Sequence, residues 1–131
     1  AVKEMNPRVK VIGVEPDTAN DTFLSLERGK ITPISPTTTI ADGLRTTQPG
    51  DLTFPIIKTL IDDLVLVSED EIKSAFHCLL ERTKQIVEPS SAVTVAAILS
   101  GKLDVKGKRI VAVLSGGNID LVQVGKFLPG K

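Results

Sequence analysis

A serine and two glycines directly follow an apolar run, and this is the first place where the sequence could do chemistry. The run occupies residues 109–114, and Ser115, Gly116 and Gly117 come after it. Ligands of parallel α/β sheets bind beyond the carboxyl ends of strands, so a strand over 109–114 would turn the Ser115 hydroxyl toward a ligand. Glycines let a ligand approach the backbone, and amides that enter a following helix can meet an anion. An ordinary glycine turn with a capping serine is the alternative, and spacing alone favours it, since the motif is neither a Walker loop nor a G-x-G-x-x-G fingerprint.

Three carboxylates form a second candidate site, in a turn that follows another short apolar run. Glu15, Asp17 and Asp21 lie close together in the sequence. Two carboxylates and a carbonyl oxygen suit a hard cation such as Mg²⁺, which keeps several of its waters. The alternative is a helix N-terminus that carries acids because the helix macrodipole favours them. The residues alone favour this alternative, and no EF-hand spacing is present.

The remaining side chains with reactive chemistry are His77, Cys78 and Glu88. The chain has one histidine and one cysteine, so it cannot assemble a Cys/His zinc site. His77 and Cys78 are adjacent on a predicted helix and point in different directions, which argues against a nucleophile pair and for structural roles. Glu88 stands before a proline and an apolar helix, and is either a half-buried cap or a site residue.

These candidates depend on an alternating series of strands and helices. Apolar and β-branched runs predict strands at residues 9–14, 64–67 and 109–114. Helices are predicted at residues 21–29, 54–61 and 92–99, and after the capping box Ser68-Glu69-Asp70-Glu71. The first of these would be capped by Asn20 or Asp21 and stopped by Gly29, and the helix at 92–99 would be capped by Ser90 or Ser91. Residues 31–50 predict a long loop around a strand-like segment at 39–41, of the kind that is functional or disordered. The alternation predicts an α/β fold with a mainly parallel sheet and flanking helices, in a single domain over residues 1–131.

The helix that follows the capping box has the clearest amphipathic pattern in the chain. Apolar residues recur at helical spacing and predict one buried face, made of Ile72, Ala75, Phe76, Leu79 and Leu80.

The composition is that of a globular protein and excludes several classes of function. The 131 residues hold 16 Lys and Arg against 16 Asp and Glu, so no basic excess marks a face that binds nucleic acid. Aromatic residues make up 3%, without Trp or Tyr, so no platform for stacking bases is available. No apolar run approaches the roughly 20 residues that span a membrane. A single cysteine, and a start that does not resemble a signal peptide, fit a cytoplasmic protein.

Four separated motifs resemble those of the serine racemase/threonine dehydratase family, whose members are fold-type II pyridoxal-phosphate enzymes. The motifs are residues 13–16 (GVEP), 39–43 (TIADG), 87–90 (VEPS) and 115–118 (SGGN), in the order and approximate spacing of that family. The resemblance covers nearly the whole chain, which looks like the C-terminal part of the cofactor-binding large domain. The resemblance is greatest to eukaryotic-type serine racemases, for two reasons. The first is the turn that follows the first motif. The second is that the given sequence ends soon after Ser115, whereas biosynthetic threonine dehydratases carry a regulatory domain beyond the last motif.

The resemblance implies a cofactor-binding role for Ser115, Gly43, Glu88 and Asp42. In the family, the serine of the last motif contacts the pyridine nitrogen of pyridoxal 5′-phosphate. An alcohol cannot keep that nitrogen protonated as a carboxylate would, so the cofactor is a weaker electron sink, suited to proton removal at Cα followed by reprotonation or loss of the β-hydroxyl. By the same match, Gly43 lies close to the cofactor, Asp42 near the mouth of the site and Glu88 near the ring.

The resemblance also implies a metal site and a nucleotide site. Glu15, the carbonyl of Ala19 and Asp21 match the ligands of a divalent cation, Mg²⁺ or Ca²⁺. Lys84 matches a position that faces the nucleotide at the dimer interface of ATP-responsive racemases. A homodimer with ATP as effector is therefore expected.

The expected function is amino-acid metabolism, with L-serine or L-threonine as the substrate class. The resemblance implies interconversion of L- and D-serine and elimination of serine to pyruvate and ammonia. The family's Schiff-base lysine and glycine-rich phosphate loop precede the point where this chain begins, so no residue is assigned as catalytic. The segment is expected to be inactive without an N-terminal half and to expose a sheet edge and apolar surface. The alternatives are a catabolic threonine dehydratase fragment and a non-catalytic metal- or nucleotide-binding module that complements a separate N-terminal chain.

Overall fold

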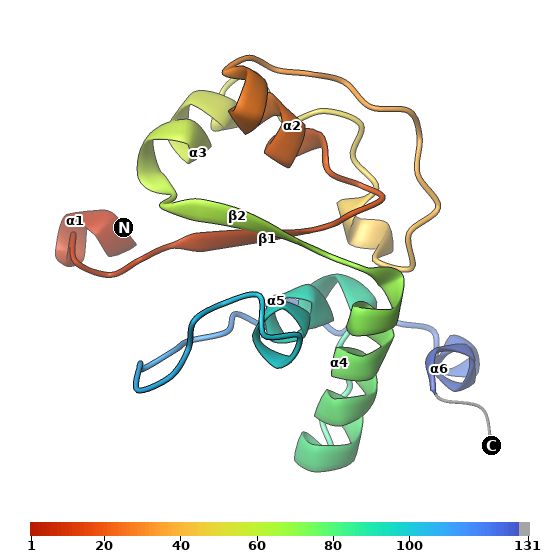
Figure 1. Ribbon diagram of the computed structural model, residues 1–131. Helices are drawn as coiled ribbons and strands as arrows, with labels where there is room; N and C mark the ends of the chain where they lie inside the picture. The colour runs from red at the N-terminus through yellow and green to blue at the C-terminus, as the bar shows by residue number, and fades with distance from the viewer. Residues whose placement is uncertain (129–131) are drawn as a thin grey trace.

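The chain folds into two parallel strands surrounded by helices, as a computed structural model that describes residues 1–128 shows (Figure 1). In chain order the elements are α1 (Val2–Met5), β1 (Ile12–Pro16), α2 (Asp21–Arg28), the 3₁₀ turn η1 (Asp42–Leu44), α3 (Thr53–Leu60), β2 (Asp63–Val67), α4 (Glu69–Thr83), α5 (Pro89–Leu99) and α6 (Leu121–Phe127).

The two strands form a short parallel sheet that has helices on both sides. Ile12 of β1 lies opposite Asp63 of β2, and Pro16 lies opposite Val67 at the other end. α2 and α3 lie over one face of this sheet and α5 lies against the other (Figure 1). The predicted fold class, α/β with a parallel sheet and flanking helices, is therefore confirmed.

Helix α4 begins as its capping box predicts. The Ser68 side chain accepts a hydrogen bond from the Glu71 amide at 3.3 Å, and the Glu71 carboxylate accepts one from the Ser68 amide at 2.7 Å. Two backbone donors that a helix N-terminus leaves unpaired are thus satisfied reciprocally. Because β2 ends at Val67, this cap fixes the angle at which the chain leaves the sheet.

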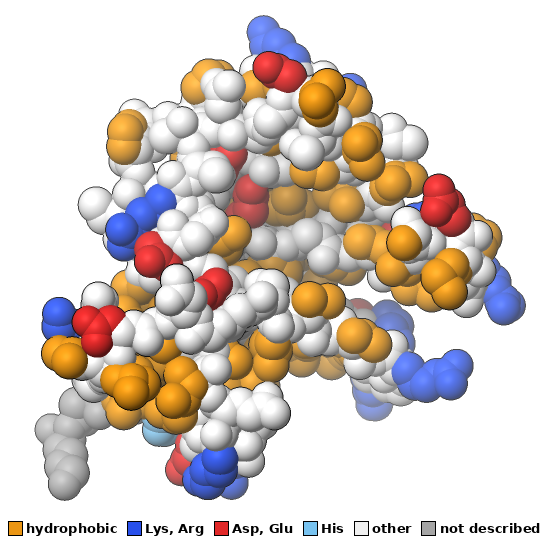
Figure 2. All heavy atoms as spheres, turned by 180° about the vertical axis from the view of Figure 1, so that it is seen from behind, with side chains coloured by type: hydrophobic (Ala, Val, Ile, Leu, Met, Phe, Trp, Pro, Cys, Tyr) orange, Lys and Arg blue, Asp and Glu red, His pale blue; other side chains and the backbone are white. Residues whose placement is uncertain are grey.

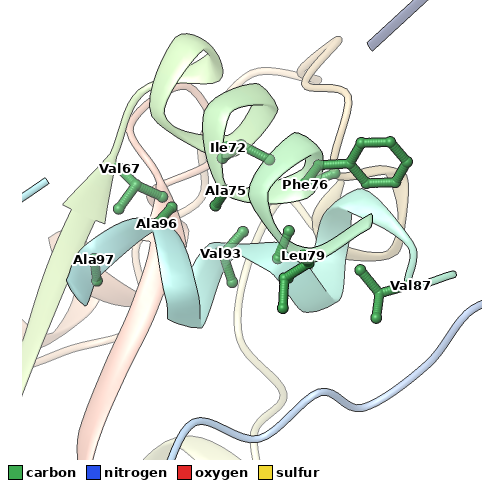
Figure 3. Close-up of a cluster of buried hydrophobic side chains, with 11 residues drawn as sticks. Val67, Ile72, Ala75, Phe76, Leu79, Val87, Val93, Ala96 and Ala97 are labelled. Atoms are coloured by element: carbon green, nitrogen blue, oxygen red, sulfur yellow. The ribbon is translucent and has the colours of Figure 1, made fainter. Parts of the chain in front are cut away.

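The hydrophobic core lies between α4, α5 and the end of β2 (Figure 3). The predicted apolar face of α4 is confirmed for four of its five residues, whereas Leu80 is only half-buried. Small residues on α5, such as Ala96 and Ala97, let the two helices approach closely. Phe76 also meets Phe127 of α6 edge to face, with ring centroids 5.8 Å apart. The packing of α4 on α5 holds the first turn of α5 in place.

The predicted strand over residues 109–114 is wrong for this chain. A strand needs a neighbour whose backbone pairs with its own N–H and C=O groups, and residues 1–128 supply none there. The segment is instead extended and largely exposed, with Val111 90% and Val113 64% exposed. The Thr94 hydroxyl, which donates to the Val113 carbonyl at 3.3 Å, ties it to α5.

Three other predictions about the helices and strands also differ from the structure. The strand predicted at residues 9–14 begins later and ends later, because its limits are set by pairing with β2. The segment 39–41 forms no strand and leads into η1. The residue before Pro89, rather than Ser90 or Ser91, is the N-cap of α5, since proline is well suited to the first helical position.

Much apolar surface is exposed, as expected from the sequence. The accessible surface of the chain is 8545 Å², whereas a compact monomer of 14.0 kDa exposes about 6,700 Å². Figure 2 shows hydrophobic side chains on much of one face, including along a recess that crosses it. Among the described helices, none has the length and apolar character needed to cross a membrane.

Candidate cofactor-binding site

Three segments that are distant in the sequence meet at the N-terminus of α5. They are residues 42–44, 88–91 and 115–118. The Gly43 amide donates to the Ser90 hydroxyl at 2.9 Å, and the Glu88 amide donates to the Gly116 carbonyl at 3.1 Å. The structure thus brings together the segments of Asp42, Gly43, Glu88 and Ser115, the four residues predicted to surround the cofactor.

A buried hydroxyl that the sequence predicted only as a candidate helix cap fixes the serine-glycine loop. Ser91 is 1% exposed. Its Oγ accepts a hydrogen bond from the Gly116 amide at 2.7 Å and donates to the Gly116 carbonyl at 2.8 Å. The Ser91 and Ser115 hydroxyl oxygens lie 3.3 Å apart. Because Ser115 itself is exposed, its hydroxyl can contact a ligand while its backbone is held from below.

The two glycines of the loop are required by the protein's own packing. A Cβ on Gly116 would lie 2.9 Å from a Glu88 carboxylate oxygen, and a Cβ on Gly117 would lie 2.7 Å from the Ile86 carbonyl oxygen. Neither glycine has a positive φ. The sequence interpretation that these glycines leave room for a ligand is therefore incomplete, since part of that room is filled by residues 86–88.

Glu88 has the position of a helix cap, and its role as a site residue stays a prediction. It occupies the N-cap position of α5, but its side chain makes no capping hydrogen bond to that helix. Instead, its carboxylate accepts a hydrogen bond from the Asn118 amide at 3.0 Å. Glu88 is half-buried and binds the loop through both its backbone and its side chain.

Asp42 and Gly43 are placed by the loop over residues 31–50, which a second carboxylate anchors. Glu69, at the start of α4, accepts hydrogen bonds from the Thr39 hydroxyl and from the Ile40 amide, the latter at 2.9 Å. No local pattern predicts this anchor, because a glutamate in a first helical turn is expected on dipole grounds alone. The loop is held against α4 just before it reaches the site.

The acidic turn holds its two predicted carboxylate ligands in partly dehydrated surroundings. The Glu15 carboxylate accepts hydrogen bonds from the amides of Thr22 and Phe23, at 3.3 and 3.0 Å, and so stabilises the N-terminus of α2. Asp21 is 1% exposed and accepts from the Thr46 hydroxyl at 3.2 Å. Burial raises the pKa of Glu15, and the nearby charge of Asp21 adds to the rise. Burial also raises the pKa of Asp21.

A raised pKa means that the ionised carboxylates are under-compensated by the protein, which is the condition in which a cation would bind best. In residues 1–128, no group of three or more His, Cys, Asp or Glu side chains could hold a metal ion. The predicted site is of a different kind, since it uses Glu15, Asp21 and the backbone carbonyl of the buried Ala19. It stays a prediction.

The predicted nucleotide residue and the two predicted structural residues lie on or just after α4. Lys84 ends this helix in the left-handed conformation, with φ of 60°. Its ammonium group is exposed and donates to the Glu81 carbonyl at 2.6 Å. The nucleotide role stays a prediction. His77 and Cys78 are both half-buried on the same helix.

The parallel α/β fold is that of its structural neighbours, the fold-type II pyridoxal-phosphate enzymes. Comparison with known families agrees, since the family model described as pyridoxal-phosphate-dependent enzyme matches residues 1–116. The chain belongs to this family.

The similar proteins include both ammonia-lyases and racemases. The chain is 45% identical over 128 residues to an L-threonine ammonia-lyase of Thermotoga maritima, covering 98% of this chain and 32% of that protein. It is 50% identical over 131 residues to a serine racemase of Dictyostelium discoideum, covering 96% of this chain and 40% of that protein. The structure of maize serine racemase superposes with a TM-score of 0.88 at 37% identity, covering 96% of this chain and 40% of that one. The chain thus spans well under half the length of these relatives.

The residues at the meeting point fit a pyridoxal-phosphate ring. Ser115 offers a neutral hydroxyl, which can donate to an unprotonated ring nitrogen. Gly43 offers a backbone without a side chain beside the same helix terminus, and its amide is already paired with Ser90. The Glu88 carboxylate is engaged by the Asn118 amide. The donor set therefore suits a neutral aromatic nitrogen.

Proposed function

We propose that this chain is the part of a pyridoxal-phosphate-dependent serine racemase that contacts the cofactor's pyridine ring. The enzyme would interconvert L- and D-serine and eliminate serine to pyruvate and ammonia. The observation that carries this proposal is the exposed Ser115 hydroxyl, on a loop that Ser91 and Glu88 hold through Gly116 at the N-terminus of α5.

The chemistry at Ser115 suits reactions that need a modest carbanion stabilisation. When bound, pyridoxal phosphate supplies an electron sink for charge that develops at Cα of an amino acid. Ser115 donates a hydrogen bond to the ring nitrogen and does not transfer a proton to it, because an alcohol is a far weaker acid than a pyridinium ion. Gly43 and Asp42 bound the site on the side of η1, and Glu88 fixes the loop that carries Ser115.

The exposed surface favours the presence of further polypeptide. The excess over a compact monomer is about 1,800 Å², more than twice the roughly 800 Å² that one partner buries in a standard interface. We propose that the segment which completes the relatives' length covers this surface and supplies the Schiff-base lysine and the phosphate-binding loop. The assembled enzyme, meaning this chain together with that segment on the same or a separate polypeptide, is the active species. This chain alone is inactive.

Further parts of the proposal concern ligands and assembly. Mg²⁺ or Ca²⁺ binds Glu15, the Ala19 carbonyl and Asp21, where the two raised carboxylate pKa values favour a cation. ATP binds near Lys84, whose ammonium group is exposed, at the interface of a homodimer. The enzyme acts in the cytoplasm.

A threonine ammonia-lyase is the second candidate, because the identity to the Thermotoga maritima enzyme is nearly as high as that to the Dictyostelium racemase. The two candidates are separated by incubating the assembled enzyme with L-serine and with L-threonine. D-serine is measured by chiral chromatography and the keto acids by their absorbance. We expect D-serine and pyruvate from L-serine. A large excess of keto acid from L-threonine, without D-serine, would favour the ammonia-lyase, and no turnover of either substrate would contradict both.

A further inference from the structure

The two adjacent serines at the start of α5 have different tasks. Ser90 accepts the hydrogen bond of the Gly43 amide, on the side of η1. Ser91 faces the opposite segment, where its hydroxyl lies between the amide and the carbonyl of Gly116 and 3.3 Å from the Ser115 hydroxyl. Ser91 is thus the nearest hydroxyl partner of the residue proposed to bind the ring nitrogen.

The hydrogen-bond inventory around Ser91 leaves its hydrogen atom free to change partner. A serine hydroxyl has one hydrogen to donate and two lone pairs to accept with. One lone pair of Ser91 is used by the Gly116 amide. Its hydrogen is directed to the Gly116 carbonyl, but that carbonyl also accepts from the Glu88 amide at 3.1 Å. If the Ser91 hydrogen turned to Ser115, the carbonyl would still be satisfied.

The direction of the bond between the two hydroxyls decides what Ser115 can do. When Ser115 donates to Ser91, the Ser115 hydrogen is not available to a ligand. When Ser91 donates to Ser115, the Ser115 hydrogen is free to point outward, and the chain of two hydroxyls makes its hydrogen bond stronger. A ligand atom that only accepts, such as an unprotonated ring nitrogen, selects the second arrangement.

We propose that Ser91 is a positioning residue that donates to Ser115 and thereby directs the Ser115 hydroxyl hydrogen to the cofactor's ring nitrogen. This inference rests on the proposed function, since it takes the ring nitrogen as the ligand of Ser115. Ser91 is buried beneath the loop and touches no ligand, so it acts only through Ser115.

A double-mutant cycle in the assembled enzyme tests this role. Ser91→Ala and Ser115→Ala are made singly and together, and the dissociation constant of pyridoxal phosphate is measured with the absorbance spectrum of the bound cofactor. Ser91→Ala should weaken cofactor binding about fivefold in the parent protein, the factor that corresponds to one hydrogen bond. In the Ser115→Ala background, the same change should have no further effect.

Ser25 offers a matched control. It is fully buried, its hydroxyl donates to the Asp21 carbonyl at 2.7 Å and accepts from the Thr32 amide at 2.9 Å, and so, like Ser91, it bonds one backbone carbonyl and one backbone amide. It does not contact Ser115. Ser25→Ala should therefore change cofactor affinity by the same factor in both backgrounds. If Ser91→Ala prevents folding, Ser91→Cys keeps the size of the side chain and weakens its hydrogen bonds.

The outcomes separate the two proposals. Equal effects of Ser91→Ala in both backgrounds would show a merely structural role and overturn this inference alone. An unchanged affinity and spectrum in Ser115→Ala would overturn the assignment of Ser115 and the inference with it. A second readout needs no cofactor: exchange of the Gly116 amide hydrogen should accelerate in Ser91→Ala, and unchanged exchange would contradict the geometry on which the inference depends.

Discussion

Gly117→Ala should destabilise the chain more than any other glycine-to-alanine change in the serine-glycine loop. The new Cβ would lie 2.7 Å from the Ile86 carbonyl oxygen. This oxygen belongs to the backbone and cannot swing aside as a side chain can, so the loop itself must move. A shift weakens the hydrogen bonds by which Glu88 holds Gly116 and Asn118.

The magnitude follows from two contributions. Overpacking of a filled site costs typically 1–3 kcal/mol, or about 2 here. Two hydrogen bonds with a net contribution near 0.5–1.5 kcal/mol each would be weakened rather than abolished, which adds about 1 kcal/mol. The free energy of unfolding should therefore fall by about 3 kcal/mol, a large fraction of the stability of a domain of this size.

Two other glycines provide the comparison. The Cβ of Gly116→Ala would meet the Glu88 carboxylate, which can rotate away, so the loss should be nearer 1 kcal/mol. Within the described residues, nothing outside its own helix lies within 4 Å of a Cβ added to Gly125 of α6, and alanine there should gain about 0.5–1 kcal/mol in helix propensity.

Urea unfolding followed by circular dichroism at low protein concentration measures all three variants. The expected order of stability is Gly125→Ala, then the parent chain, then Gly116→Ala, then Gly117→Ala. A Gly117→Ala variant as stable as the parent chain would refute the close packing of the loop against residues 86–88.

Three more predictions concern the carboxylates. Asp21→Asn should raise the free energy of unfolding at neutral pH without divalent cations, because it removes a buried charge. Mg²⁺ should raise the melting temperature of the parent chain but not that of Asp21→Asn, and a parent chain whose melting temperature does not respond to Mg²⁺ would refute the metal site. The pKa values of Glu15 and Asp21 are raised in the folded chain, so without cations their ionisation costs stability, and this cost should shrink as pH falls from neutral toward the ordinary pKa of a carboxyl group. Urea titrations of the parent chain and of Asp21→Asn measure it: the stability advantage of Asp21→Asn should narrow as pH falls, and an advantage that does not change with pH would contradict the assignment. Glu69→Gln weakens the hydrogen bonds to Thr39 and Ile40, so the free energy of unfolding should fall by about 1 kcal/mol. Limited proteolysis should then cut the loop over residues 31–50 faster, and an unchanged cleavage rate would show that Glu69 is not needed to hold this loop.

Elements whose signals are local could be predicted from the sequence. The capping box at Ser68 and the apolar stripe that follows it specify α4, and Gly29 ends α2 in the left-handed conformation that favours glycine. The segment over 109–114 could not be predicted correctly, because the same apolar run forms a strand only where a neighbouring strand pairs with it.

The motif match singled out Asp42, Gly43, Glu88 and Ser115, and the fold brings their segments together at one helix terminus, while their role toward the cofactor stays a prediction. Ser91 was interpreted as a possible helix cap, which is the usual reason for a serine at such a place. Its contact with Gly116 joins residues far apart in the sequence, and no local pattern reveals it.

Ser115 of this chain is proposed to bind the ring nitrogen of pyridoxal phosphate in an enzyme that acts on serine. The most direct measurement is the turnover of L-serine by the assembled enzyme, with D-serine and pyruvate quantified for the parent protein and for Ser115→Ala at saturating cofactor. We expect both products from the parent protein and a loss of at least about tenfold in rate for the variant, which corresponds to about 1.4 kcal/mol at the transition state. Equal rates for both proteins would contradict the assignment of Ser115, and no turnover of L-serine by a cofactor-loaded parent protein would contradict the proposed reaction.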